Sequence, residues 1–121
     1  MKEKRGHLRY PVKILNPVQA AISINQNRWY NVHPLNISQS GIKLLGNLAD
    51  YRIKINPTVK LKFLQISNNG KNQNIIGGII KRHYTYHPPD IQLVETGVEF
   101  IKNSEQDTNA VNKLIEQIAD K

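Results

Sequence analysis

Apolar and polar side chains alternate along most of the chain, which is the pattern of β-strands that bury one face. In residues 18–24 an apolar side chain occupies every second position, and Asn25 to Asn27 then favour a turn. Similar patterns predict five further strands, at residues 28–35, 42–45, 56–68, 74–86 and 91–101.

The fourth and fifth predicted strands carry additional signals. Asn68 to Gly70 favour a tight hairpin turn between the two strands. In the fifth strand the paired glycines Gly77 and Gly78 suit a bend or a close crossing of strands. The fourth strand has basic residues at Lys60 and Lys62, which alternate with the apolar residues Val59, Leu61 and Phe63.

The periodicity changes after residue 103. Ser104 and Asp107 have the spacing of a capping box, in which each side chain bonds an amide at the start of a helix. The following apolar residues recur at the spacing of one helical stripe: Val111, Leu114, Ile115 and Ile118. The sequence therefore predicts a C-terminal helix over about residues 104–119.

Short turns and the absence of intervening helices predict that the strands pair antiparallel, and closure into a barrel would remove the exposed strand edges. We therefore expect an all-β fold with a C-terminal helix, in which a six-stranded antiparallel barrel is capped at one end by that helix. Residues 10–121 form this single domain, and residues 1–9 are expected to be a flexible basic arm.

Composition narrows the class of protein. The 121 residues suit one domain, and without cysteine the chain has neither disulfides nor thiolate chemistry. No apolar run is long enough to cross a bilayer, because the richest one, Ile75 to Ile80, has six residues and contains two glycines. An N-terminal secretory signal is also missing, so we expect a cytoplasmic protein without a membrane span.

The net charge of +8 is unevenly distributed. Residues 1–62 contain 11 Lys and Arg against two Asp and Glu, whereas residues 63–121 contain six against seven. A basic half of this kind favours an anionic partner, such as a nucleotide, a nucleic acid or an anionic membrane surface. An ordinary solvated face is the alternative.

Catalytic and metal-binding patterns are missing. His83 and His87 are four residues apart, but they fall on a predicted strand and turn, where this spacing does not bring two ligands together. Gly77 and Gly78 lie inside an apolar strand without the Gly-Lys-Ser/Thr of a phosphate-binding loop. We therefore expect neither an enzyme, nor a metal site, nor a bound cofactor.

Two motifs carry the functional signal. Arg5 and Arg9 have the form Arg-x-x-x-Arg, and Asn36 to Gly41 have the form Asn-x-Ser-x-x-Gly. In this order, before six strands and a helix, they resemble the PilZ domain family, the bacterial receptors for cyclic di-GMP. Gly78 to Ile80 and Gly97 to Phe100 resemble later strands of the same family.

The resemblance implies a two-part nucleotide site. The arginines of the arm would bind guanine edges and phosphates, because a guanidinium fork matches both. The polar turn would read a guanine from the other side, and its glycine, which can take positive φ or allow close approach to the backbone, would hold the turn in place. The expected cyclic di-GMP ligands are Lys4, Arg5, Arg9, Asn36, Ser38 and Gly41.

The resemblance further implies that the arm folds over the barrel when nucleotide binds, and that the protein signals to a protein partner in motility, adhesion or biofilm control. Two alternatives stay open. One is a PilZ-like adaptor that binds no nucleotide. The other, which we favour least, is a small barrel that binds single-stranded nucleic acid through stacking aromatic residues. Candidates for that stacking are Trp29, Tyr30, Tyr84 and Tyr86.

Overall fold

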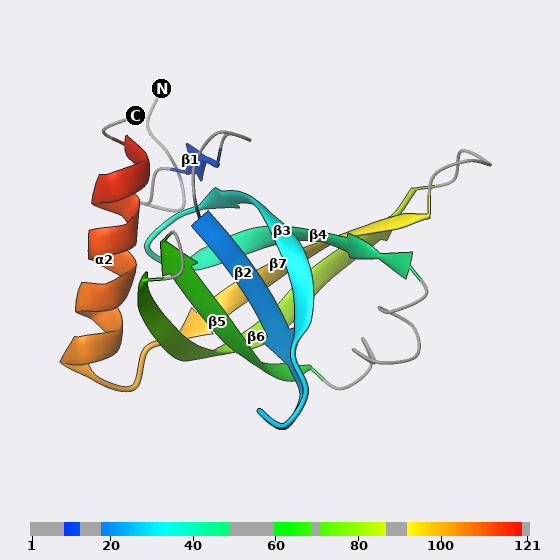
Figure 1. Cartoon of the computed structure of the whole chain (residues 1–121). Coiled ribbons are helices and arrows are strands. Elements are labelled where there is room, and N and C mark those ends of the chain that lie inside the picture. The colour runs from blue at the N-terminus through cyan, green and yellow to red at the C-terminus, as the bar shows by residue number, and fades with distance from the viewer. Residues whose placement is uncertain (1–8, 13–17, 49–59, 69–70, 87–91, 120–121) are drawn as a thin grey trace.

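The computed structural model describes residues 9–12, 18–48, 60–68, 71–86 and 92–119. Within these residues it contains seven strands followed by the C-terminal helix (Figure 1). The strands are β1 (Tyr10–Pro11), β2 (Val18–Ser23), β3 (Tyr30–Ile37), β4 (Gly41–Asn47), β5 (Leu61–Asn68), β6 (Lys71–Thr85) and β7 (Leu93–Ile101), and the helix is α2 (Glu105–Ala119).

Six of the strands close into an antiparallel barrel, as the sequence predicts. The strand order is β3-β2-β5-β6-β7-β4, and β4 pairs back with β3 to complete the ring. Closure satisfies the backbone groups that an open sheet would leave at its edges. The remaining strand, β1, pairs antiparallel with the end of β3, beyond the residues of β3 that pair with β2.

The inward face of β5 carries a lysine beside its apolar residues. Lys62, Leu64 and Ile66 are buried, whereas Leu61 is 50% exposed. Because side chains alternate strictly along an unbulged strand, Lys62 shares the inward face of Leu64 and Ile66. The apolar residue Leu61 consequently faces outward, so the alternation around Lys62 is present with the lysine on the buried face.

Burial changes the chemistry of Lys62, which has no exposed surface. Desolvation, together with the positive charge of Lys60, lowers the pKa of Lys62 from 10.5 to about 8. The barrel therefore contains an amine whose charged form is disfavoured by folding.

The helix closes the apolar core against one end of the barrel (Figure 1). Ser104 Oγ accepts a hydrogen bond from the amide of Asp107 at 3.2 Å, as expected for the cap. The Asp107 carboxylate accepts from the amide of Asn103 at 3.2 Å, one residue before the cap. The predicted stripe is buried with the barrel interior, and its members are Val111, Leu114, Ile115 and Ile118.

The two glycines in the middle of β6 are not equivalent. A Cβ added to Gly78 would lie 2.5 Å from Val98 Cγ1 and 3.2 Å from Leu64 Cδ1, so the interior has no room for it. A Cβ on Gly77 would meet Ile101 at an ordinary 3.6 Å on the outer face. The close crossing of strands expected from the sequence therefore requires glycine only at position 78.

This difference predicts opposite outcomes for two matched substitutions. Gly78→Ala should lower the free energy of unfolding by about 1–3 kcal/mol, because the new methyl group overpacks the core. Gly77→Ala should be neutral or slightly stabilising, since alanine restricts the unfolded chain and fits the folded one. Urea unfolding of both variants measures the difference, and equal destabilisation would contradict the crossing inferred at position 78.

Lys62 predicts a distinctive dependence of stability on pH. Its pKa is about 8 in the folded state and 10.5 in the reference state, so the unfolded chain binds more protons between these values. Stability should therefore rise with pH from about 8 to about 10.5. Thermal unfolding across this range should show the rise in the wild-type protein and lose it in Lys62→Met. An unchanged pH dependence in Lys62→Met would assign the effect to another group.

Candidate functional site

Strand β1 brings the end of the arm to the polar motif. Tyr10 and Pro11 pair with Ile37 and Asn36 of β3. The residue before β1, Arg9, donates a hydrogen bond from Nη1 to Asn36 Oδ1 at 3.2 Å, although the two are 27 positions apart in the chain. One residue from each predicted motif is therefore in direct contact with the other.

The turn itself is shorter than the hexapeptide motif, because Asn36 and Ile37 belong to β3 and Gly41 begins β4. Ser38 is buried, and its Oγ accepts hydrogen bonds from the amides of Ser40 and Gly41, each at 3.3 Å. Its own amide donates to the carbonyl of Gly41 at 2.8 Å. In this arrangement the Ser38 hydroxyl organises the turn from inside.

Contacts from β7 and α2 fix the turn from outside. The amide of Phe100 donates to the carbonyl of Ser40 at 2.8 Å, and Lys102 Nζ donates to the carbonyl of Gln39 at 2.6 Å. The Gln39 side chain donates to Asn112 Oδ1 of the helix at 3.2 Å. Contacts within the protein therefore fix the conformation of this turn.

Gly41 is required by the close approach of β7. A Cβ at this position would lie 2.3 Å from the carbonyl oxygen of Val98, which is backbone and cannot move aside. The φ angle of Gly41 lies outside the left-handed region. Gly41 is therefore not needed for a positive φ angle. It is needed because the backbone of the neighbouring strand β7 approaches it closely.

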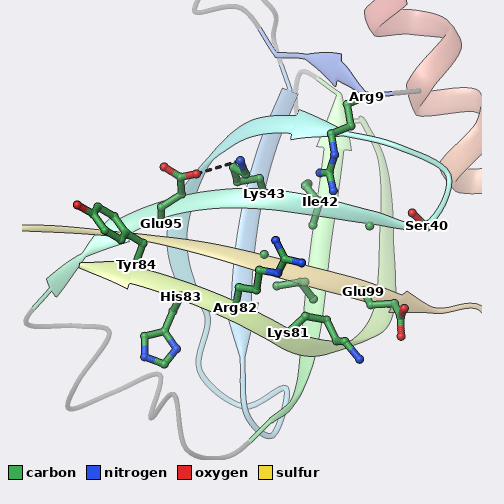
Figure 2. Close-up of a pocket in the computed structure, with 13 residues that line it drawn as sticks. Arg9, Ser40, Ile42, Lys43, Lys81, Arg82, His83, Tyr84, Glu95 and Glu99 are labelled. Carbon is green, nitrogen blue, oxygen red and sulfur yellow. Dashed lines mark ion pairs between the residues drawn. The ribbon is translucent and has the colours of Figure 1, made fainter. Parts of the chain in front are cut away.

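A pocket of about 550 Å³ opens beside this turn, on the outer face of β4, β7 and β6. Gly41 faces Glu99 at one end, Lys43 and Arg82 flank Gly97 in the middle, and Glu95 pairs with Tyr84 at the other end. Figure 2 shows these side chains, with Arg9 reaching into the pocket from the side opposite Arg82. The cations that line the pocket are Arg9, Lys43, Lys81 and Arg82.

The charge of Lys43 is balanced within the pocket. Its Nζ lies 3.1 Å from Glu95 Oε1, and the Tyr86 hydroxyl donates to Glu95 Oε2 at 2.6 Å. The hydrogen bond from Tyr86, supported by Lys43, lowers the pKa of Glu95, and the same bond raises the pKa of Tyr86. Glu95 is therefore held as a carboxylate by two neighbours.

The structure brings together part of the predicted ligand set. Arg9 and Gly41 line the pocket, and Asn36 contacts Arg9 next to it. Ser38 lies behind the turn, and Lys4 and Arg5, with the rest of the arm before Arg9, lie outside the described residues.

Sequence reasoning missed the residues that form the wall of the pocket, which come from β4, β6 and β7 and are far apart in the chain. No signal in the sequence marks them, because strand register, including the bulge in β6, decides which of these residues lie side by side. The predicted ligand set did not include these polar residues of the pocket lining: Ser40 of the turn and Lys43, Lys81, Arg82, His83, Tyr84, Glu95 and Glu99 of the strands.

Metal and membrane features were searched within the described ranges. No group of three or more His, Asp or Glu side chains there has the arrangement of a metal site. His83 is exposed on β6, and His87 lies outside the described residues. No helix in the described part of the chain combines the length and apolar character needed to cross a membrane.

Comparison with known proteins identifies the fold. No protein-family model and no curated protein sequence matches the chain. Among solved structures, the PilZ domain of YcgR from Escherichia coli with c-di-GMP matches 98% of this chain and 93% of that chain, with a TM-score of 0.71 and 12% identity. The chain has a PilZ-like fold.

Two longer PilZ-like proteins agree. The complex of K. pneumonia MrkH with c-di-GMP matches with a TM-score of 0.72 at 10% identity, covering 98% of this chain and 54% of that chain. The complex of Borreliella burgdorferi PlzA with c-di-GMP gives 0.63 at 12% identity, covering 93% and 51%. The chain thus spans about half the length of these two proteins.

The contact between Tyr86 and Glu95 predicts a measurable shift. Tyr86→Phe removes the hydrogen bond, so the pKa of Glu95 should rise toward its ordinary value while Lys43 still holds it partly down. The lowered pKa of Glu95 stabilises the fold at pH values above the pKa of this group in the unfolded chain. This stabilisation is lost as the pH falls through the pKa of Glu95 in the folded protein. NMR titration of the Glu95 carboxyl measures the change. Tyr10→Phe, remote from Glu95, should leave that titration as in the wild type.

Proposed function

We propose that this chain is a PilZ-family receptor for cyclic di-GMP, without enzymatic activity, that reports nucleotide level to a protein partner. One observation carries the proposal: Arg9 of the Arg-x-x-x-Arg motif contacts Asn36 of the Asn-x-Ser-x-x-Gly motif at the rim of a cationic pocket. The PilZ-like fold supports the proposal, because both sequence motifs resemble those of the family with this fold.

The chemistry of the pocket suits the proposed ligand. Cyclic di-GMP carries two phosphodiester anions, and the N7 and O6 atoms of each guanine accept hydrogen bonds in parallel. A guanidinium has five N–H donors, and Arg9 uses one donor group on Asn36, so the remaining donors can bind phosphate or a guanine edge. Lys4 and Arg5 complete the proposed arm contacts.

The polar turn supplies the fixed half of the proposed site. Asn36 offers an amide to guanine, and Gly41 lines the pocket where β4 begins. Ser38 contributes by holding the amides of Ser40 and Gly41 in position. A ligand that binds this half is then covered by the arm, and this rearrangement alters the surface presented to a partner.

The neighbouring structures support the ligand and the biological setting. PlzA, MrkH and YcgR were solved with c-di-GMP, and a further match is the inhibitor of motility MotI from Bacillus subtilis. We extend both features to this chain as part of the proposal, with motility, adhesion or biofilm control as the process.

Titration calorimetry with cyclic di-GMP tests the proposal. The wild-type chain should bind with micromolar or tighter affinity, and Arg9→Ala should weaken binding at least about tenfold through loss of a charged bidentate donor. Arg28→Ala is the matched control, because Arg28 is exposed in the segment between β2 and β3 and does not line the pocket. This control should bind as the wild type does.

Three results would contradict the proposal in different ways. Absence of binding by the wild type favours the adaptor that takes no nucleotide. Undiminished affinity in Arg9→Ala removes the arm from the site. Steeply salt-dependent binding of oligonucleotides, with little preference for the cyclic dinucleotide, favours a nucleic-acid-binding barrel.

A further inference from the structure

A bulge in β6 turns Arg82 toward the outer face of the barrel. Ile76, Gly78 and Ile80 of β6 face the interior at every second position, so an uninterrupted strand would direct residue 82 inward as well. The register with β7 shifts instead: Ile80 pairs with Val98, and Arg82 pairs with the next residue, Gly97. The additional residue, Lys81, therefore places Arg82 on the face that carries the pocket.

Gly97 leaves the floor of the pocket open between two cations. On one side it pairs with Lys43 of β4, and on the other with Arg82 of β6. A Cβ on Gly97 would come no closer than 3.9 Å to Arg82 Cβ, so packing does not require glycine here, in contrast to Gly41 and Gly78. The missing side chain instead leaves space beside Arg82 on the outer face.

Arg82 differs from Lys43 and Arg9 in its present contacts. Lys43 is paired with Glu95, and Arg9 is bonded to Asn36. The side chain of Arg82 is exposed and makes no hydrogen bond or ion pair with any residue in the described part of the chain. Figure 2 shows its guanidinium directed into the pocket from below while that of Arg9 enters from above.

We propose that Arg82 is a second guanidinium contact for the dinucleotide, binding a phosphodiester from the barrel wall opposite Arg9. The inference rests on the proposed function and adds to it a residue outside both sequence motifs. Arg82 stands on a 15-residue strand and is paired there with Gly97 of β7, so its contact is in place before the arm closes. Arg9, beside a two-residue strand, supplies the contact that can be made and broken.

Calorimetry with cyclic di-GMP on three variants tests this role. Arg82→Gln should weaken binding about tenfold or more, because both the charge and the fork are lost. Arg82→Lys should give an intermediate loss, since lysine keeps the charge but not the bidentate geometry. Arg28→Gln removes the same charge from an exposed site outside the pocket and should stay within about twofold of the wild type.

The outcomes separate this inference from the proposed function. If the wild type binds cyclic di-GMP and Arg82→Gln binds as Arg28→Gln does, the role of Arg82 is overturned and the receptor function stands. If the wild type does not bind, both fall. Thermal unfolding checks that the variants are folded, and should Arg82→Gln fail to fold, Arg82→Lys decides: affinity equal to the wild type overturns the role, and a loss supports it.

Discussion

The pairing of β4 with β3 on one side and β7 on the other is the constraint on which the rest of the structure depends. It closes the barrel, and at the first residue of β4 it brings the backbone of β7 so close that only glycine fits at Gly41. The same crossing lets the amide of Phe100 bond the turn at Ser40. A requirement of the core thus determines the shape of a surface turn.

The inward and outward faces of β4, β6 and β7 differ in function. Inward side chains of β4, β6 and β7, with those of α2, form one apolar core. Outward side chains of the same three strands form most of the cationic pocket, in which Glu95 balances the charge of Lys43 and leaves Arg82 available. Because strand side chains alternate, substitutions in the pocket wall can change binding chemistry with little effect on the core.

Periodicity was sufficient to predict the barrel strands and the helix, because their stripes are regular and the cap of Ser104 is local. It does not show which face of β5 is buried, because Lys62 enters the interior while its apolar neighbour Leu61 faces outward. Arg9 and Asn36 could be predicted because each belongs to a short motif that is contiguous in the sequence. Arg82 was missed because its direction depends on a bulge that only strand pairing reveals.

Because β1 has only two residues, few contacts attach this segment to the barrel. It is held to β3 by its two paired residues, by the hydrogen bond from the Val12 amide to the Leu35 carbonyl at 2.9 Å, and by the exposed hydrogen bond from Arg9. Each such hydrogen bond contributes about 1 kcal/mol, and the buried side chain of Val12 adds about 1.5–3 kcal/mol. A ligand of micromolar affinity brings about 8 kcal/mol. If a part of that energy comparable to these contacts differs between the docked and the undocked arm, binding would shift the balance between the two. In the proposed receptor, nucleotide binding would therefore decide whether this segment is attached, while the closed barrel behind it stays unchanged.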